Sequence, residues 1–150
     1  MQPVVTAGAG FLLAVLWFDL MFDMQVARYR HTDVPEPVVG SIAAYYRRVT
    51  TDARPMNRLV ALAMLVTLAG IVVQLVRGDG AIVARCVSLV LALVPIALAG
   101  ARTLPSAVRL GSRRDPFDAQ AALARAIFAQ HVICACSIAA LLVVQLVWMG

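Results

Sequence analysis

Two aspartates and one histidine in the apolar parts of this sequence have the residue types that acid–base chemistry needs. Asp19 and Asp23 are four residues apart in WFDLMFDMQ, so a helix presents both on one face. His131 lies in a separate apolar stretch. An imidazole takes up a proton near neutral pH, and a neighbouring carboxylate can orient its ring. We therefore name Asp19, Asp23 and His131 as the candidate catalytic residues.

Four further side chains extend this candidate site toward a ligand. Arg28 and Gln130 lie close to these residues in sequence, and Arg58 and Arg102 are expected on the same side of the membrane. We interpret all four as ligand-binding, with an arginine placed to stabilise an oxyanion. The ligand class that fits is a hydrophobic aromatic or quinone-like molecule in a shallow pocket, with redox or oxygenase-like chemistry. The sequence names no cofactor.

The composition places this chemistry in a membrane. Of the 150 residues, 62% are hydrophobic and 14% are charged, and the mean hydropathy is +0.86, far above that of an ordinary soluble domain. The net charge of +5 comes from 13 arginines, with no lysine, against 8 acidic residues. Because the arginines stand between apolar runs, they are typical of topology signals, and we expect no nucleic-acid partner. The expected partners are the lipid bilayer, a hydrophobic small molecule, and either a second copy or a membrane complex.

Four apolar stretches are each long enough to cross a bilayer core of about 30 Å, which takes about 20 residues of helix. They predict an all-α, four-transmembrane helix bundle that forms a single domain. The first stretch lacks the basic start and the cleavage site of a signal peptide, so we expect it to be retained as a helix. The expected spans are residues 3–26, 57–77, 81–101 and 117–149.

Depth within these spans suggests which polar residues can meet. Pro3 and Trp148 are the expected outer ends of the first and fourth spans, and a helix needs about 20 residues from such an end to reach the other side of the bilayer core. This count puts Asp19 and His131 at nearly the same depth. The two side chains can therefore meet if the first and fourth spans are neighbours.

The connecting segments 27–56 and 102–116 carry the charge that orients the bundle. All of the 13 arginines except Arg77 and Arg85 lie on the side of these two segments. By the positive-inside rule both segments are cytoplasmic and both termini face outside. A composition rich in Ala, Val, Leu and Arg is typical of a GC-rich genome and carries no functional weight. With four spans and this orientation, we expect a multi-pass protein of a bacterial inner membrane.

One part of the first connecting segment has helical periodicity. In PVVGSIAAYYRRVTTDA, which starts at Pro37, apolar residues recur at helical spacing while the arginines lie elsewhere on the wheel. The pattern predicts an interfacial amphipathic helix after the first span.

The layout resembles the small four-span membrane proteins grouped with fungal anthrone oxygenases. The resemblance rests on the Gly- and aromatic-rich GAGFLLAVLWFDLMFD, the YYRR helix, the third-span exit RTLPSAVRLG, and a fourth span entered through Arg125 and His131. It implies a four-helix bundle and the oxygenation of a polycyclic phenol, and it leaves the cofactor open.

Other functions fit the same residues. The cluster can be structural, with its charged side chains fixing helix register. The chain can also be a structural or interaction subunit whose Arg47–Arg48 helix docks a larger membrane complex. A third alternative is a small proton-coupled exporter, although the carboxylates lie near one end of their span rather than at the midplane. A metal or haem site also fits the residue types, since histidine and carboxylates suit iron, copper or zinc. We assign no metal ligands, because the chain has only two histidines, His31 and His131, and no Glu-x-x-His pair.

Overall fold

The computed structural model describes residues 1–29 and 33–148, without the side chain of Arg54. These residues form helices and short connections and no strand, which confirms the all-α prediction. Two helices are followed by a short π-helical segment, at Arg48–Asp52 and Ala99–Thr103. The α-helices are α1 (Gln2–Ala27), α2 (Glu36–Arg47), α3 (Arg54–Arg77), α4 (Ile82–Leu98), α5 (Leu104–Ser112) and α6 (Phe117–Trp148).

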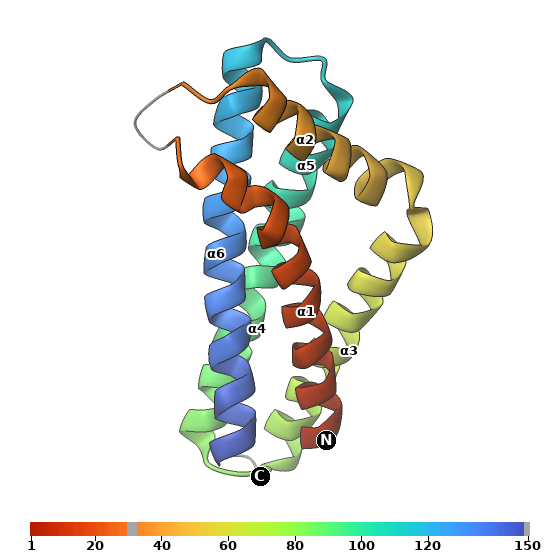
Figure 1. Ribbon diagram of the computed structural model, residues 1–150. Coiled ribbons are helices and arrows are strands. Elements are labelled where there is room, and N and C mark those ends of the chain that lie inside the picture. Colours follow the sequence, from red (N-terminus) through yellow and green to blue (C-terminus); the bar gives the residue numbers. More distant parts are fainter. Residues whose placement is uncertain (30–32, 149–150) are drawn as a thin grey trace.

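Four of the helical stretches are long and apolar enough to span a membrane, as the hydropathy predicted. They are Gln2–Ala27, Pro55–Arg77, Ile82–Ser112 and Phe117–Trp148. α1 packs against α3 and α6, and α4 completes the bundle by packing against α3 and α6 as well (Figure 1). The long helices therefore surround one core, with α1 beside α6.

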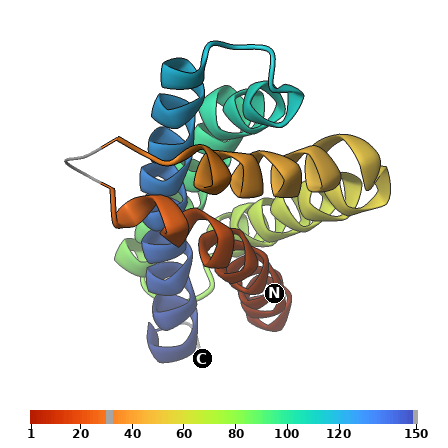
Figure 2. The same cartoon turned by 45° about the horizontal axis from the view of Figure 1, so that its top comes forward.

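Helix α2 crosses one end of this bundle, which we call the α2 end (Figures 1 and 2). The N-terminus and the turn between α3 and α4 lie at the opposite end, which we call the terminal end. The predicted amphipathic helix is thus confirmed, and its apolar face is covered by protein: Val39, Ile42, Ala43 and Tyr46 are buried against α5, α1 and α6. Gly111 of α5 permits the close approach, because a Cβ there would lie 2.7 Å from the backbone nitrogen of Arg47.

The third long helix extends past the predicted span 81–101 and is helical through to Ser112. Pro95 has no N–H to bond the carbonyl of Leu91, but the helix continues and widens into the π-helical segment Ala99–Thr103. In α5, Ala107 and Leu110 are buried beneath α2. The residues that we expected to be a loop are therefore a helix that supports α2.

Side-chain amides join all four long helices at the terminal end. Gln74 of α3 and Gln145 of α6 exchange two hydrogen bonds of 2.9 and 3.2 Å, and Gln145 also donates to the Ser88 hydroxyl of α4 at 3.0 Å. Gln2 donates to the backbone oxygen of Gln145 at 3.2 Å. Each amide is satisfied by another helix, so this network fixes how the helices align.

Candidate functional site

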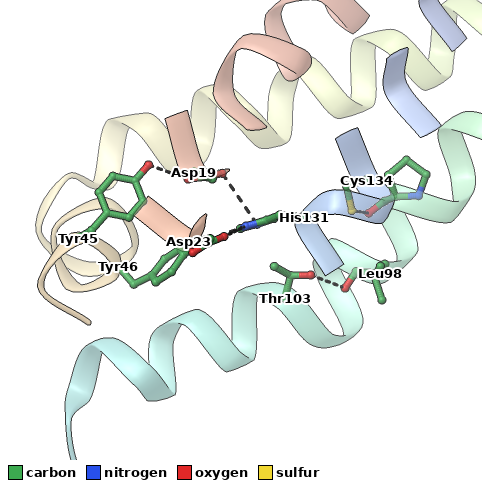
Figure 3. A network of polar contacts seen from close by, with 9 residues as sticks. Asp19, Asp23, Tyr45, Tyr46, Leu98, Thr103, His131 and Cys134 are labelled. Atoms are coloured by element: carbon green, nitrogen blue, oxygen red, sulfur yellow. Dashed lines mark hydrogen bonds and ion pairs between the residues drawn. The ribbon is translucent and has the colours of Figure 1, made fainter. Parts of the chain in front are cut away.

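Asp23 and His131 form the centre of a polar cluster at the α2 end (Figure 3). The Asp23 side chain is fully buried, and its Oδ2 lies 2.6 Å from His131 Nδ1. α1 supplies the carboxylate and α6 the imidazole, and these two helices are neighbours, which is the condition under which the sequence allowed the two side chains to meet. A carboxylate at Nδ1 favours the tautomer with a proton on Nδ1, which leaves the lone pair on Nε2.

Tyr46 of α2 completes the partners of Asp23. Its hydroxyl donates to Asp23 Oδ1 at 2.7 Å and lies 3.3 Å from His131 Nδ1. Both oxygens of the buried carboxylate therefore accept a hydrogen bond, which a buried charge requires. Tyr46 is itself only 2% exposed. This arrangement holds the imidazole in one orientation.

Asp19 faces the other nitrogen of the same imidazole. Its Oδ2 lies 3.9 Å from His131 Nε2, and its Oδ1 accepts a 2.7 Å hydrogen bond from the hydroxyl of Tyr45. The Asp19 side chain keeps 15% of its surface exposed, whereas that of Asp23 keeps none. The cluster thus has a sealed side at Asp23 and a more open side at Asp19.

Aromatic rings frame the open side. The ring of Tyr45 stacks on Phe22 with centroids 4.1 Å apart and an interplanar angle of 9°. Tyr46 meets Tyr45 edge to face at 5.3 Å. Burial raises the pKa of both phenols above the ordinary value, and the neighbouring carboxylates raise it further. Both tyrosines therefore stay protonated and act as hydrogen-bond donors.

Sequence reasoning missed the role of these two tyrosines. Tyr45 and Tyr46 fit the apolar face of the predicted amphipathic helix, and the periodicity alone indicates packing for both side chains. The available signal was the hydroxyl groups, because a tyrosine on a buried face needs a polar partner for its O–H. Asp19 and Asp23 repeat on α1 at a spacing of four, and the two adjacent tyrosines reach one carboxylate each.

The four predicted ligand-binding residues lie around the cluster rather than in it. Arg28, Arg58 and Arg102 are exposed, and no hydrogen bond or ion pair among the described residues joins them to Asp19, Asp23 or His131. Gln130 is partly buried, and its Oε1 is enclosed without a hydrogen-bond partner in the described part of the chain.

The described residues contain no group of three or more His, Cys, Asp or Glu side chains placed to hold a metal ion. His31 lies outside the described residues. Two apolar hollows of about 270 and 390 Å³ lie along α4, and they share Val87; the larger also touches Trp148. Neither hollow is lined by a residue of the cluster.

Comparisons with known protein families, with curated proteins and with solved structures found no match for this chain.

Proposed function

We propose that this protein is a membrane-embedded enzyme in which Asp19 and His131 take a proton from the hydroxyl of a lipid-soluble phenol or quinol. The observation that carries the proposal is the 2.6 Å contact between Asp23 Oδ2 and His131 Nδ1, with Nε2 directed to Asp19. A carboxylate that orients an imidazole and balances its positive charge is the usual arrangement for a histidine base. Asp23 is then a positioning residue.

The proton moves in two steps. The ligand O–H bond breaks as Asp19 Oδ1 takes the proton, and the electron pair stays on the ligand as a phenolate. Asp19 then passes the proton to His131 Nε2 and returns to the carboxylate form. The present 3.9 Å separation of Asp19 Oδ2 and Nε2 needs to shorten by about 1 Å to reach hydrogen-bond distance, and catalytic contacts are often long before a ligand binds.

Deprotonation makes the ligand easier to oxidise, because a phenolate gives up an electron more readily than a phenol. In the oxygenase-like reaction one electron passes from the phenolate to dioxygen, which is the co-reactant that this proposal requires, and gives a phenoxyl radical and superoxide. These combine through a new C–O bond, and the resulting hydroperoxide anion takes back the proton held by His131. The proposed substrate class agrees with the polycyclic phenol that the resemblance to anthrone-oxygenase-like proteins implies. In this proposal the Gln130 amide and an arginine among Arg28, Arg58 and Arg102 stabilise the phenolate oxygen.

We further propose that the α2 end faces the cytoplasm of a bacterial cell and that both termini face outside. The distribution of arginines supports this orientation. Arg28, Arg47 and Arg58 lie at or next to helix ends at the α2 end, and Arg102 lies in the π-helical segment that leads into α5, whereas the turn between α3 and α4 follows Arg77. A reporter fused after Gly150 is expected to be active only outside the cytoplasm, and activity inside would overturn the orientation.

The test uses 4-nitrophenol, which absorbs visible light strongly only as the phenolate. Added to the purified protein at a pH where the free probe is protonated, it is expected to develop the phenolate band. His131→Gln removes the final acceptor and should abolish the band, and Asp23→Asn should weaken it. Cys136→Ser, an exposed change on the same helix, should leave it unchanged.

A structural cluster is the second candidate function, favoured by the complete burial of Asp23 and by its hydrogen bonds to two other helices. In that case His131→Gln and Asp23→Asn lower the thermal stability, and the wild-type protein gives no phenolate band. A band of equal strength in wild type and His131→Gln would contradict the proposed proton transfer.

A further inference from the structure

The two tyrosines of the cluster differ in how firmly they are held. Tyr46 is 2% exposed and touches both Asp23 and His131. Tyr45 is half-buried, and among the described residues its hydroxyl bonds to Asp19 alone. Its ring rests on Phe22, which is 36% exposed. Tyr46 is therefore part of the core of the cluster, whereas Tyr45 closes its open side.

Tyr45 makes the contacts that an external phenol would need. A planar ring lies on Phe22 at a centroid distance of 4.1 Å, and a phenolic hydroxyl donates 2.7 Å to the carboxylate that faces His131 Nε2. Stacking on an aromatic ring and a hydrogen bond to a carboxylate are among the stronger contacts available to such a ligand. The position is filled by a side chain of the protein itself.

We infer that Tyr45 is an internal ligand: its side chain occupies the phenol-binding position of the site, and a lipid-soluble phenol binds by displacing it from Phe22 and Asp19. This inference rests on the proposed function and adds how the site is closed and which residues select the ligand. Tyr45 and Phe22 are then specificity-determining residues, because a ligand must make better contacts with Phe22 and Asp19 than Tyr45 does.

The packing of α2 allows this displacement. The helix is held by its buried residues Val39, Ile42 and Ala43 and by the close contact of Arg47 with Gly111, whereas Tyr45 is only partly buried and packs against the edge of this cluster. Tyr45 can therefore change rotamer while α2 stays in place. The displaced side chain stays a neutral phenol, because the ordinary pKa of tyrosine, about 10, lies well above neutral pH.

The surface next to Phe22 indicates where the ligand enters. Trp17, Phe18 and Met21 precede Phe22 on α1 and are 58–67% exposed. Because α1 is one of the four candidate spans, these side chains belong to the apolar surface that lipid covers in a membrane protein. A membrane-dissolved aromatic molecule therefore reaches Tyr45 sideways along α1.

The experiment replaces the internal ligand by an external one. Tyr45→Ala removes the ring and hydroxyl, and 4-methylphenol is the matching free side chain. The probe is expected to raise the melting temperature of Tyr45→Ala in a concentration-dependent way, with less effect on wild type. Toluene, which lacks the hydroxyl, should raise the melting temperature of Tyr45→Ala much less. When Asp19→Ala is added to the Tyr45→Ala protein, 4-methylphenol and toluene should raise its melting temperature equally.

Binding of 1-naphthol gives the quantitative result. We expect the dissociation constant to fall by about tenfold or more in Tyr45→Ala, because the competing side chain is gone. Tyr45→Phe keeps the ring and loses only the hydroxyl, so a smaller gain is expected, and this variant replaces Tyr45→Ala if the latter does not fold. Unchanged or weaker binding in the folded variants would overturn the inference.

The two proposals fail in different ways. Binding of 4-methylphenol to Tyr45→Ala does not require His131 to take up a proton. If this probe binds as described but wild type gives no phenolate band with 4-nitrophenol, the internal-ligand inference stands and the proposed chemistry fails. If wild type gives the band and neither Tyr45 variant binds 1-naphthol more tightly, the chemistry stands and the inference fails.

Discussion

Asp23 and His131 are 108 residues apart in the chain, and their side chains meet at 2.6 Å inside the bundle. The contact links α1 to α6, and the hydroxyl of Tyr46 adds α2 to the same carboxylate. One buried side chain thus holds three helices together and sets the tautomer of the imidazole. The stability of the α2 end and its chemistry therefore depend on the same residue.

Asp23→Ala is expected to lower the free energy of unfolding by about 3 kcal/mol, because it leaves the imidazole and the Tyr46 hydroxyl buried without their partner. Tyr46→Phe removes one donor and should cost about 1 kcal/mol. Denaturation in a mild detergent measures both. A loss from Asp23→Ala no larger than that from Tyr46→Phe would show that the carboxylate is not the centre of the cluster.

Alkaline pH is expected to destabilise the protein through its two cluster tyrosines. Their pKa is raised in the folded protein, so the unfolded chain releases these protons first, and stability falls as the pH rises above about 10. Absorbance of tyrosinate near 295 nm follows the ionisation. In a protein that carries both Tyr45→Phe and Tyr46→Phe, the loss of stability at alkaline pH should be much smaller. A loss equal to that of the wild-type protein would show that these two tyrosines do not cause it.

Gly111→Ala is expected to move α2 away from α5. The added Cβ would lie 2.7 Å from the backbone nitrogen of Arg47, so the helices must separate at a cost of about 1–3 kcal/mol. The matched control is Gly10→Ala, where nothing lies within 4 Å of the new Cβ and a helix interior gains from the change. Equal melting temperatures for the two variants would argue against the close packing of α2.

At the terminal end, the two buried glutamines are expected to behave as a unit. Gln145→Leu leaves Gln74 and Ser88 without partners and should cost about 1–2 kcal/mol. In the Gln145→Leu protein, Gln74→Leu should lower the free energy of unfolding by less than it does in the wild-type protein, because the partner amide is already gone. A double-mutant cycle of unfolding free energies measures the coupling, and strictly additive losses would mean that the pair is not joined.

The bundle itself could be read from the sequence, because continuous apolar stretches predict spanning helices directly. Depth in the membrane matches Asp19 with His131 and makes their meeting depend on the first and fourth spans being neighbours. In the structure the close contact of His131 is with Asp23, one turn farther along α1, and Asp19 lies 3.9 Å away. Pairing of the helices did not follow, because apolar residues cover most sides of α1 and α6 and no single face marks the neighbour.

Two features of the α2 end could not be read in the same way. The apolar stretch predicts that the third span ends at residue 101, just before Arg102, yet a π-helical segment carries the helix to Ser112. The site role of Tyr45 and Tyr46 depends on how α2 folds back over α1. That placement is set by tertiary packing on α5, which no local pattern records.

The most direct measurement is ¹⁵N NMR of the imidazole in a His31→Gln protein, which keeps His131 as its only histidine. The proposed mechanism predicts a proton on Nδ1 and none on Nε2 before a phenol is added, and a new proton on Nε2 afterwards. Asp23→Asn should change the protonation of the ring before the phenol is added, because the carboxylate that favours the proton on Nδ1 is gone. A ring protonated on both nitrogens from the start, or one that does not respond to the phenol, would contradict proton transfer to His131.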